Sequence, residues 1–262
     1  MNNSVIEIIS IGEELLIGKI VNTNAQWIAK KLTDMGWKVR RITTIGDDVN
    51  EIVSAIRESL SRGTKVIITT GGLGPTFDDK TIEAISKATN RRLILDENVL
   101  KEIEEKLKRR GRTLSEPAKK MAYIPEGSKI INNLIGTAPG IILEHEGATI
   151  IALPGVPSEM EDMFEREITK ILEFKHKLQE KELTIYNVPE AELAPTIIEL
   201  MREIPNIYIK SHPKTELGDK ITLKLHIYSQ KYEDKDWGEI VEKIKEKIRE
   251  KHNYCEIEEN II

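Results

Sequence analysis

The sequence predicts an α/β protein with a mostly parallel sheet, followed by a small α+β domain. Strand and helix patterns alternate over the first two-thirds of the 262 residues. The run KVIITT at 65–70 is almost continuously apolar or β-branched, which is typical of a strand covered on both faces of a parallel sheet. Beyond residue 174 strands follow one another directly, as in α+β domains. A chain of this length suits two compact domains.

Caps and apolar spacing define the first four elements. Thr23 or Asn24 is predicted to cap the first helix, and Gly36 ends it. Asp48, with Glu51 three residues later, begins the second helix in the manner of a capping box. The predicted order is strand Val5–Ile11, helix to Gly36, strand Lys38–Ile45, and helix from Asp48 to Gly63.

The rest of the first domain continues the alternation. The elements predicted after strand 65–70 are a helix from about Asp79 to Thr89, a helix from Asp96 to Gly111, the strand pair Ile141–Leu143 and Thr149–Leu153, and a helix from Ser158 to about Leu172. Two strands joined through a short turn at 145–147 indicate one antiparallel pair beside the parallel strands.

A polar, charged connection, KHKLQEKE, predicts a domain boundary near residue 175. The predicted domains are therefore 1–174 and 175–262. The second reads as strand Glu182–Tyr186, helix Glu190–Arg202, strand Ile207–Ser211, strand Lys220–Tyr228 and helix Trp237–Lys251, a βαββα order.

Composition excludes several classes of protein. A net charge of -5 with dispersed basic residues gives no strong sign of nucleic-acid binding. A single cysteine, Cys255, excludes a disulfide framework and suits a reducing compartment. No segment resembles a signal peptide or reaches membrane-spanning length, so we expect a cytoplasmic protein without membrane attachment.

The stretch TTGGLGPTFDDKT follows strand 65–70, at the carboxyl edge where open α/β sheets bind ligands. Gly71, Gly72 and Gly74 allow backbone amides to approach an anion closely. Their spacing differs from GxGxxG, and no lysine and hydroxyl complete GxxxxGK[ST]. The two most familiar nucleotide loops are excluded, but a phosphate-binding loop remains a candidate function.

Asp78 and Asp79 would repel a bare phosphate, so a divalent cation of the Mg²⁺ type between carboxylate and phosphate is expected. Glu13 and Glu14 follow strand 5–11 at the equivalent edge and could share that cation. The alternatives are that an aspartate only caps the next helix, and that the glutamate pair is a solvated surface.

Polar residues at neighbouring loops are further candidates. Asn22 and Asn24 flank a hydroxyl at a helix start, where they either cap the helix or bind a ligand. In LPGVPSEM, Gly155 lies between prolines at the end of a predicted core strand. Ser158 opens the following helix, for which capping is a sufficient explanation. Scattered histidines and the absence of GxSxG exclude a zinc-hydrolase or serine-nucleophile motif.

These loops resemble those of the CinA (competence/damage-inducible protein A) family, whose first domain is of the MoaB/MogA molybdopterin-binding type. The matching stretches are GEELLIGKIVNTNAQWIA, TTGGLGPTFDDKT, GTAPG and LPGVPSEM, in the family's order over about 170 residues. YNVPEAELAPTI and KITLKLHIYS resemble the small domain that follows in CinA proteins. Bacterial members often carry a further amidase domain acting on nicotinamide mononucleotide, which we do not expect in a chain of this length.

The resemblance implies a three-layer αβα first domain, usually self-associated into a homo-oligomer, that binds a nucleotide or pterin phosphate. It also implies metal-dependent hydrolysis of the pyrophosphate of ADP-ribose-like nucleotides. In related molybdenum-cofactor enzymes, positions matching Asp79 and Glu13 serve adenylyl transfer to molybdopterin. The resemblance adds Thr137 of GTAPG, and Thr81 at the end of the glycine stretch, to the candidates for phosphate or ribose binding.

The sequence therefore predicts a metal-dependent nucleotide pyrophosphatase acting on ADP-ribose-like substrates. Asp78, Asp79 and Glu14 are the candidate catalytic residues, and Asp78, Asp79 and Glu13 the candidate ligands of Mg²⁺ or a similar cation. A molybdopterin-binding or adenylyl-transferring protein is one alternative. A non-catalytic nucleotide-binding regulatory module is the other.

Overall fold

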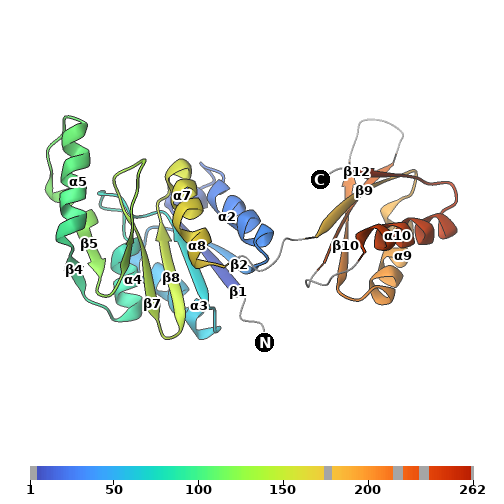
Figure 1. The fold of residues 1–262 in the computed structure, drawn as a ribbon, viewed down its shortest axis with the longest axis horizontal. Helices are drawn as coiled ribbons and strands as arrows, with labels where there is room; N and C mark the ends of the chain where they lie inside the picture. The colour runs from blue at the N-terminus through green and yellow to red at the C-terminus, as the bar shows by residue number, and fades with distance from the viewer. Residues whose placement is uncertain (1–4, 174–178, 215–220, 230–235, 261–262) are drawn as a thin grey trace. The chain divides into compact units, whose positions relative to one another are not determined.

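The computed structural model describes residues 5–173, 179–214, 221–229 and 236–260. The chain divides into two compact units, Met1–Lys175 and His176–Ile262, which are described separately below (Figure 1). The predicted boundary between residues 174 and 175 lies outside the described residues.

The first unit is built on a six-stranded sheet with strand order β2-β1-β3-β8-β7-β6. Its strands are β1 (Val5–Ile11), β2 (Lys38–Ile45), β3 (Val66–Thr70), β6 (Lys129–Ile131), β7 (Gly140–His145) and β8 (Ala148–Leu153). β2, β1, β3 and β8 are parallel, whereas β7 is antiparallel to both of its neighbours. This arrangement confirms the mostly parallel sheet and the antiparallel strand pair.

Helices cover both faces of this sheet (Figure 1). One layer contains α2 (Thr23–Asp34), α7 (Pro157–Met163) and α8 (Thr169–Ile171), with a π-helical turn at Phe164–Ile168; the other contains α3 (Val49–Ser61), α4 (Thr81–Thr89) and α5 (Glu97–Arg109). Strand β1 supplies alternate side chains to the two hydrophobic cores, Ile6 and Ile8 to one and Ile9 and Ile11 to the other. The three-layer αβα fold is therefore confirmed.

Helix α2 begins at Thr23, and of the alternatives for Asn22 the structure shows the cap. Asn22, rather than Thr23 or Asn24, caps α2, because its Oδ1 accepts a hydrogen bond from the Ala25 amide at 3.2 Å. Asp48 caps α3 as predicted, and its Oδ1 accepts the amide of Glu51 at 3.1 Å.

Two other helix starts were also placed inaccurately. Helix α4 begins at Thr81, and its N-cap residue Lys80 makes no side-chain cap bond, so neither Asp78 nor Asp79 caps it. Helix α7 begins at Pro157 after Val156, again without a side-chain cap. Ser158 is exposed in its first turn.

Several short elements were missed in the first unit. They are α1 (Glu13–Leu16), β4 (Leu93–Leu95), α6 (Glu116–Lys119), the 3₁₀ turn Lys120–Ala122, β5 (Tyr123–Pro125) and β6. β4 and β5 form a separate two-stranded sheet. Three- and four-residue elements span about one turn or less, so they carry no readable hydrophobic period.

The second unit is a four-stranded antiparallel sheet, order β10-β11-β9-β12, packed against two helices. Its elements are β9 (Glu180–Tyr186), α9 (Glu190–Glu203), β10 (Ile207–Lys214), β11 (Thr222–Ser229), α10 (Trp237–Lys251) and β12 (Glu256–Asn260). The α+β class is confirmed, but the order is βαββαβ. β12 was missed because the edge strand EIEEN is charged and contains one apolar residue.

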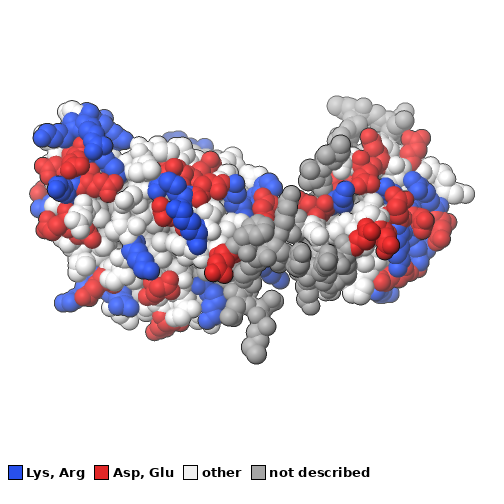
Figure 2. All heavy atoms as spheres, in the orientation of Figure 1, with Lys and Arg blue, Asp and Glu red and all other residues white. Residues whose placement is uncertain are grey.

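Acidic and basic side chains are intermixed over much of the face seen in Figure 2, with Lys and Arg gathered at the end of α5. Within the described ranges, no helix combines the length and the apolar character needed to cross a bilayer.

Candidate functional site

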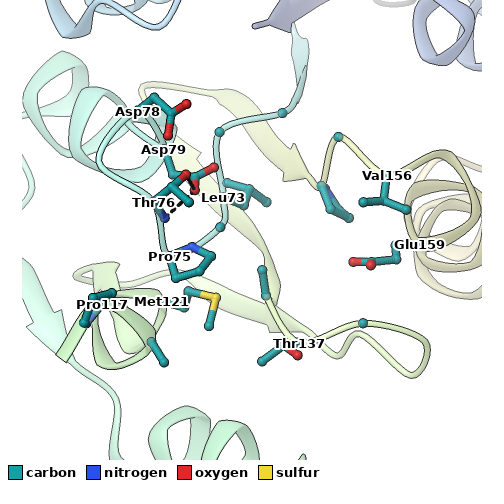
Figure 3. A pocket seen from close by; sticks show the side chains of 18 of the residues that line it. Leu73, Pro75, Thr76, Asp78, Asp79, Pro117, Met121, Thr137, Val156 and Glu159 are labelled. Atoms are coloured by element: carbon teal, nitrogen blue, oxygen red, sulfur yellow. Dashed lines mark hydrogen bonds between the residues drawn. The ribbon is translucent and has the colours of Figure 1, made fainter. Parts of the chain in front are cut away.

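A cavity of about 920 Å³ opens at the carboxyl edge of the parallel sheet. The loops that follow β1, β2, β3 and β8 line it. The loop before β7, the end of α5 and the region of α6 complete its lining. In Figure 3, Asp78 and Asp79 lie on one side, Val156 and Glu159 on another, and Thr137 below them. Parallel strands thus bring loops distant in sequence to one cavity.

The glycine stretch begins with a close contact between strands. Gly71 has a φ of +98°, and a Cβ at this position would lie 2.1 Å from the Ile11 carbonyl oxygen. The Thr81 hydroxyl donates to the Gly71 carbonyl at 2.7 Å, and the Thr81 amide donates to that of Gly72 at 3.1 Å. Thr81 is fully buried. It therefore holds the glycine turn in place and does not line the cavity.

The loop beyond Gly74 is closed by Asp79. Its Oδ2 accepts the Thr76 amide at 2.7 Å and the Thr76 hydroxyl at 2.5 Å (Figure 3). Lys120 contacts the same loop from the 3₁₀ turn, donating to the carbonyl oxygens of Thr76 at 2.8 Å and Asp79 at 2.5 Å. Asp78 is exposed in this loop and lines the cavity.

Four carboxylates line this side of the cavity: Glu14, Asp47, Asp78 and Asp79. Burial raises the pKa of Asp47, the Glu13 amide that donates to its Oδ2 at 2.9 Å opposes that rise, and the charges of Glu14, Asp78 and Asp79 add to it. The three neighbours therefore repel the Asp47 carboxylate. This concentration of negative charge is a feature that a cation would stabilise.

Asp47 was not among the residues predicted from the sequence, although its place after a strand could have identified it. Asp47 lies two residues after the end of β2, in the sequence GDD, at the same sheet edge as Glu14 and Asp79. Only Asp48, the helix cap, received an assignment. Position at the carboxyl end of a parallel strand would have identified Asp47 as well.

No cluster of three or more His, Cys, Asp or Glu in the described parts of the chain is arranged to hold a metal ion by itself. Mg²⁺ commonly uses one or two protein carboxylates and takes its remaining ligands from substrate phosphates and water. The acidic side of the cavity therefore suits a cation that arrives with its ligand.

Asn133 organises the opposite wall from a fully buried position. Its Oδ1 accepts the amides of Ile135 at 3.1 Å and Gly136 at 2.6 Å, while its Nδ2 donates to Glu159 Oε2 at 2.6 Å. A Cβ at Gly136 would lie 2.1 Å from that carboxylate. Neither Asn133 nor Glu159 was a candidate from the sequence, because the buried role of Asn133 depends on tertiary contacts.

Positive charge enters the cavity from the end of α5. Arg110 donates to the Thr137 hydroxyl at 3.1 Å and to the Ile135 carbonyl oxygen at 2.9 Å. Arg112 lines the same cavity. Arg110 and Arg112, just beyond the end of α5, thus place positive charge at the cavity.

The cavity collects most of the predicted site residues. Those that line it are Glu14, Gly71, Gly72, Gly74, Asp78, Asp79, Thr137 and Gly155. Those that do not are Glu13, Asn22, Asn24, Thr81 and Ser158.

The asparagines support the site from outside. Asn22 Nδ2 donates to Thr44 Oγ1 at 3.2 Å while its Oδ1 caps α2. Asn24 is buried, and its Nδ2 donates to the Gly155 carbonyl oxygen at 2.8 Å, which links α2 to the loop after β8.

Comparisons with known proteins identify the family of the first unit. Residues 7–173 match the protein family described as "probable molybdopterin binding domain". A solved structure of "the protein CinA with unknown function" from Thermoplasma acidophilum superposes with a TM-score of 0.61 at 40% identity, covering 65% of this chain and 99% of that one. Proteins from Sulfurisphaera tokodaii and Pyrobaculum calidifontis are 42% and 45% identical, covering 93% and 85% of this chain and 93% and 86% of their own lengths.

Proposed function

The chain belongs to the family of probable molybdopterin binding domains, and we propose that its cavity binds a nucleotide diphosphate and hydrolyses the phosphoanhydride with the help of a divalent cation. ADP-ribose-like nucleotides are the proposed substrates. The observation that carries the proposal is the group of four carboxylates beside the glycine turn in one cavity of about 920 Å³. That volume accommodates a ligand of dinucleotide size.

The cation, proposed to be Mg²⁺, fits the chemistry of the donors. Asp47 is repelled by Glu14, Asp78 and Asp79, and a bound cation would replace this repulsion with attraction. These four residues are the proposed holders, with ligand phosphate completing the coordination. When bound, the cation neutralises charge on the phosphate oxygens and polarises the phosphorus toward attack.

The protein's own residues perform the remaining steps. The glycine turn allows a phosphate to approach the backbone, and Arg110 and Arg112 balance negative charge at the opposite side of the cavity. One of the four carboxylates that the cation leaves free orients the attacking water and accepts its proton. The water oxygen bonds to one phosphorus as the anhydride P–O bond breaks, and ADP-ribose yields AMP and ribose 5-phosphate.

A molybdopterin-binding or adenylyl-transferring role is the second candidate, and the family match over residues 7–173 favours it. Both candidates use the same phosphate and cation positions. They differ in the group beyond the phosphate, which is a ribose in one case and a pterin in the other.

The test is incubation of the protein with ADP-ribose, NAD or ATP and Mg²⁺, followed by chromatography of the products. We expect AMP from ADP-ribose. Asp79→Asn should keep the fold and abolish turnover, and Asp78→Asn should lower kcat by about 100-fold or more. The matched control is Asp34→Asn on α2, whose carboxylate pairs with Lys30 at 3.2 Å away from the cavity lining.

Three results would redirect the proposal. Saturable ADP-ribose binding without product supports a non-catalytic nucleotide-binding module. Pterin fluorescence that copurifies with the protein supports the molybdopterin role. Wild-type turnover by Asp79→Asn contradicts the assigned site.

A further inference from the structure

Lys120 is a half-buried residue that contacts the loop 75–79, and no sequence motif indicated this contact. It begins the 3₁₀ turn Lys120–Ala122 and is more than forty residues from the loop it contacts. Its ammonium donates to the carbonyl oxygens of Thr76 and Asp79 at 2.8 and 2.5 Å. These bonds reach backbone atoms, so they bear on the shape of the loop rather than on one carboxylate.

The loop that Lys120 contacts has no regular secondary structure. Pro75, Thr76, Phe77 and Asp78 are exposed and belong to no helix or strand. The bonds between Asp79 and Thr76 close the loop on itself, and Thr81 fixes the adjoining glycine turn. Lys120 connects the middle of the loop to the remainder of the unit.

We propose that Lys120 is a positioning residue, whose two hydrogen bonds to the Thr76 and Asp79 carbonyl oxygens hold the carboxylates of the 75–79 loop at the cavity. The inference rests on the proposed function, because those carboxylates are the ones assigned to the cation. An ammonium suits this role, since it donates several hydrogen bonds and places positive charge beside two aspartates.

Lys119 provides a matched control next to Lys120. Its Nζ lies 4.0 Å from Glu116 Oε1, an exposed pair at the end of α6. The two lysines have the same chemistry and adjacent positions, but the Lys119 ammonium pairs with Glu116, whereas that of Lys120 donates to the loop carbonyl oxygens. Replacement of each by methionine separates the loop contact from a general loss of charge.

Loop position can be measured without any substrate. The chain has three phenylalanines, of which Phe77 is 86% exposed at the loop and Phe164 is fully buried in the core. ¹⁹F NMR of protein labelled with 4-fluorophenylalanine therefore reports on both places, with Phe77→Leu assigning the loop signal. We expect Lys120→Met to shift and narrow the Phe77 signal and to leave the Phe164 signal unchanged.

The controls make the result specific. Lys119→Met should leave both signals at their wild-type positions, and Lys120→Arg, which keeps the donors, should restore the Phe77 signal. If Lys120→Met fails to fold, Lys120→Gln is compared in the same way. An unchanged Phe77 signal in a folded Lys120→Met or Lys120→Gln protein overturns the proposal.

Kinetics then separate this inference from the proposed function. Displaced carboxylates should lower kcat for ADP-ribose by about 100-fold while KM changes little, and Lys120→Arg should recover part of the loss. A wild-type protein without turnover refutes the hydrolase but leaves the NMR comparison able to decide on Lys120. A displaced Phe77 signal with wild-type kcat refutes the positioning role alone.

Discussion

Carboxylates at the two ends of β1 have opposite surroundings. Glu7, near the beginning of the strand, is 1% exposed. Burial by itself would raise its pKa, but hydrogen bonds from Arg62, Ser59, Arg40 and Thr64 lower the pKa to about 2. Both arginines approach it at 2.7 Å. The chain itself supplies every partner that this charge needs.

At the other end of β1, Glu14 follows β1 itself and Asp47 follows the parallel neighbour β2, and both have acidic neighbours. Burial and the charges of Glu14, Asp78 and Asp79 raise the pKa of Asp47. The fold can balance the charge of a buried carboxylate with hydrogen bonds and arginines, as it does at Glu7. At the cavity it leaves the carboxylates in mutual repulsion. Groups arranged in this way are expected at functional sites.

The largest expected effect on stability comes from replacing Glu7, whose charge is balanced by the two arginines. Glu7→Gln removes a buried charge and leaves Arg40 and Arg62 without their carboxylate, which we expect to lower the free energy of unfolding by about 3 kcal/mol. This is the lower end of the range for broken buried pairs, because both arginines are partly exposed. Urea unfolding followed by circular dichroism measures it. A Glu7→Gln protein as stable as wild type would remove the contrast between the two ends.

Lowering the pH should remove the stabilisation that ionised Glu7 provides. The pKa of Glu7 falls from an ordinary 4.5 to about 2 in the folded protein, so its stabilisation is complete above pH 4.5 and is lost as the pH falls toward 2. A shift of this size corresponds to about 3 kcal/mol. We expect the difference in unfolding free energy between wild type and Glu7→Gln to shrink over that pH window. A difference that is constant from pH 5 to pH 2 would contradict the role of ionised Glu7.

Elements with a full period or a cap were predictable from the sequence. β1, β2 and α10 have the expected bounds or nearly so, because their apolar spacing and flanking glycines or aspartates agree. The short strand β4, and the charged edge strand β12, have no such signal. Their positions depend on partner strands distant in sequence.

The lining of the candidate cavity was predictable where a loop follows a strand and carries an unusual composition. Glu14, Asp79 and the glycines were found by that logic. Lys120 and Asn133 were not, because Lys120 donates to carbonyl oxygens more than forty residues away and Asn133 joins its own turn to the distant carboxylate of Glu159. Thr81 was predicted to bind the ligand, but its hydroxyl donates to the Gly71 carbonyl oxygen inside the glycine turn instead.

The smallest expected effect on stability is that of Asp47→Asn, which compares a cavity carboxylate with Glu7. Asp47→Asn removes a carboxylate that its neighbours disfavour, while the amide oxygen can still accept the Glu13 amide. Without Mg²⁺ we expect the free energy of unfolding to stay the same or to rise by up to about 0.5 kcal/mol.

With Mg²⁺ and a non-hydrolysable ADP-ribose analogue, we expect the Tm of the wild-type protein to rise. The rise should be smaller in Asp47→Asn, because a proposed holder of the cation is missing. Scanning calorimetry with and without both ligands measures the two quantities. A Mg²⁺-free loss as large as that of Glu7→Gln would mean that Asp47 is a compensated structural carboxylate, and the difference between the two ends of β1 would disappear.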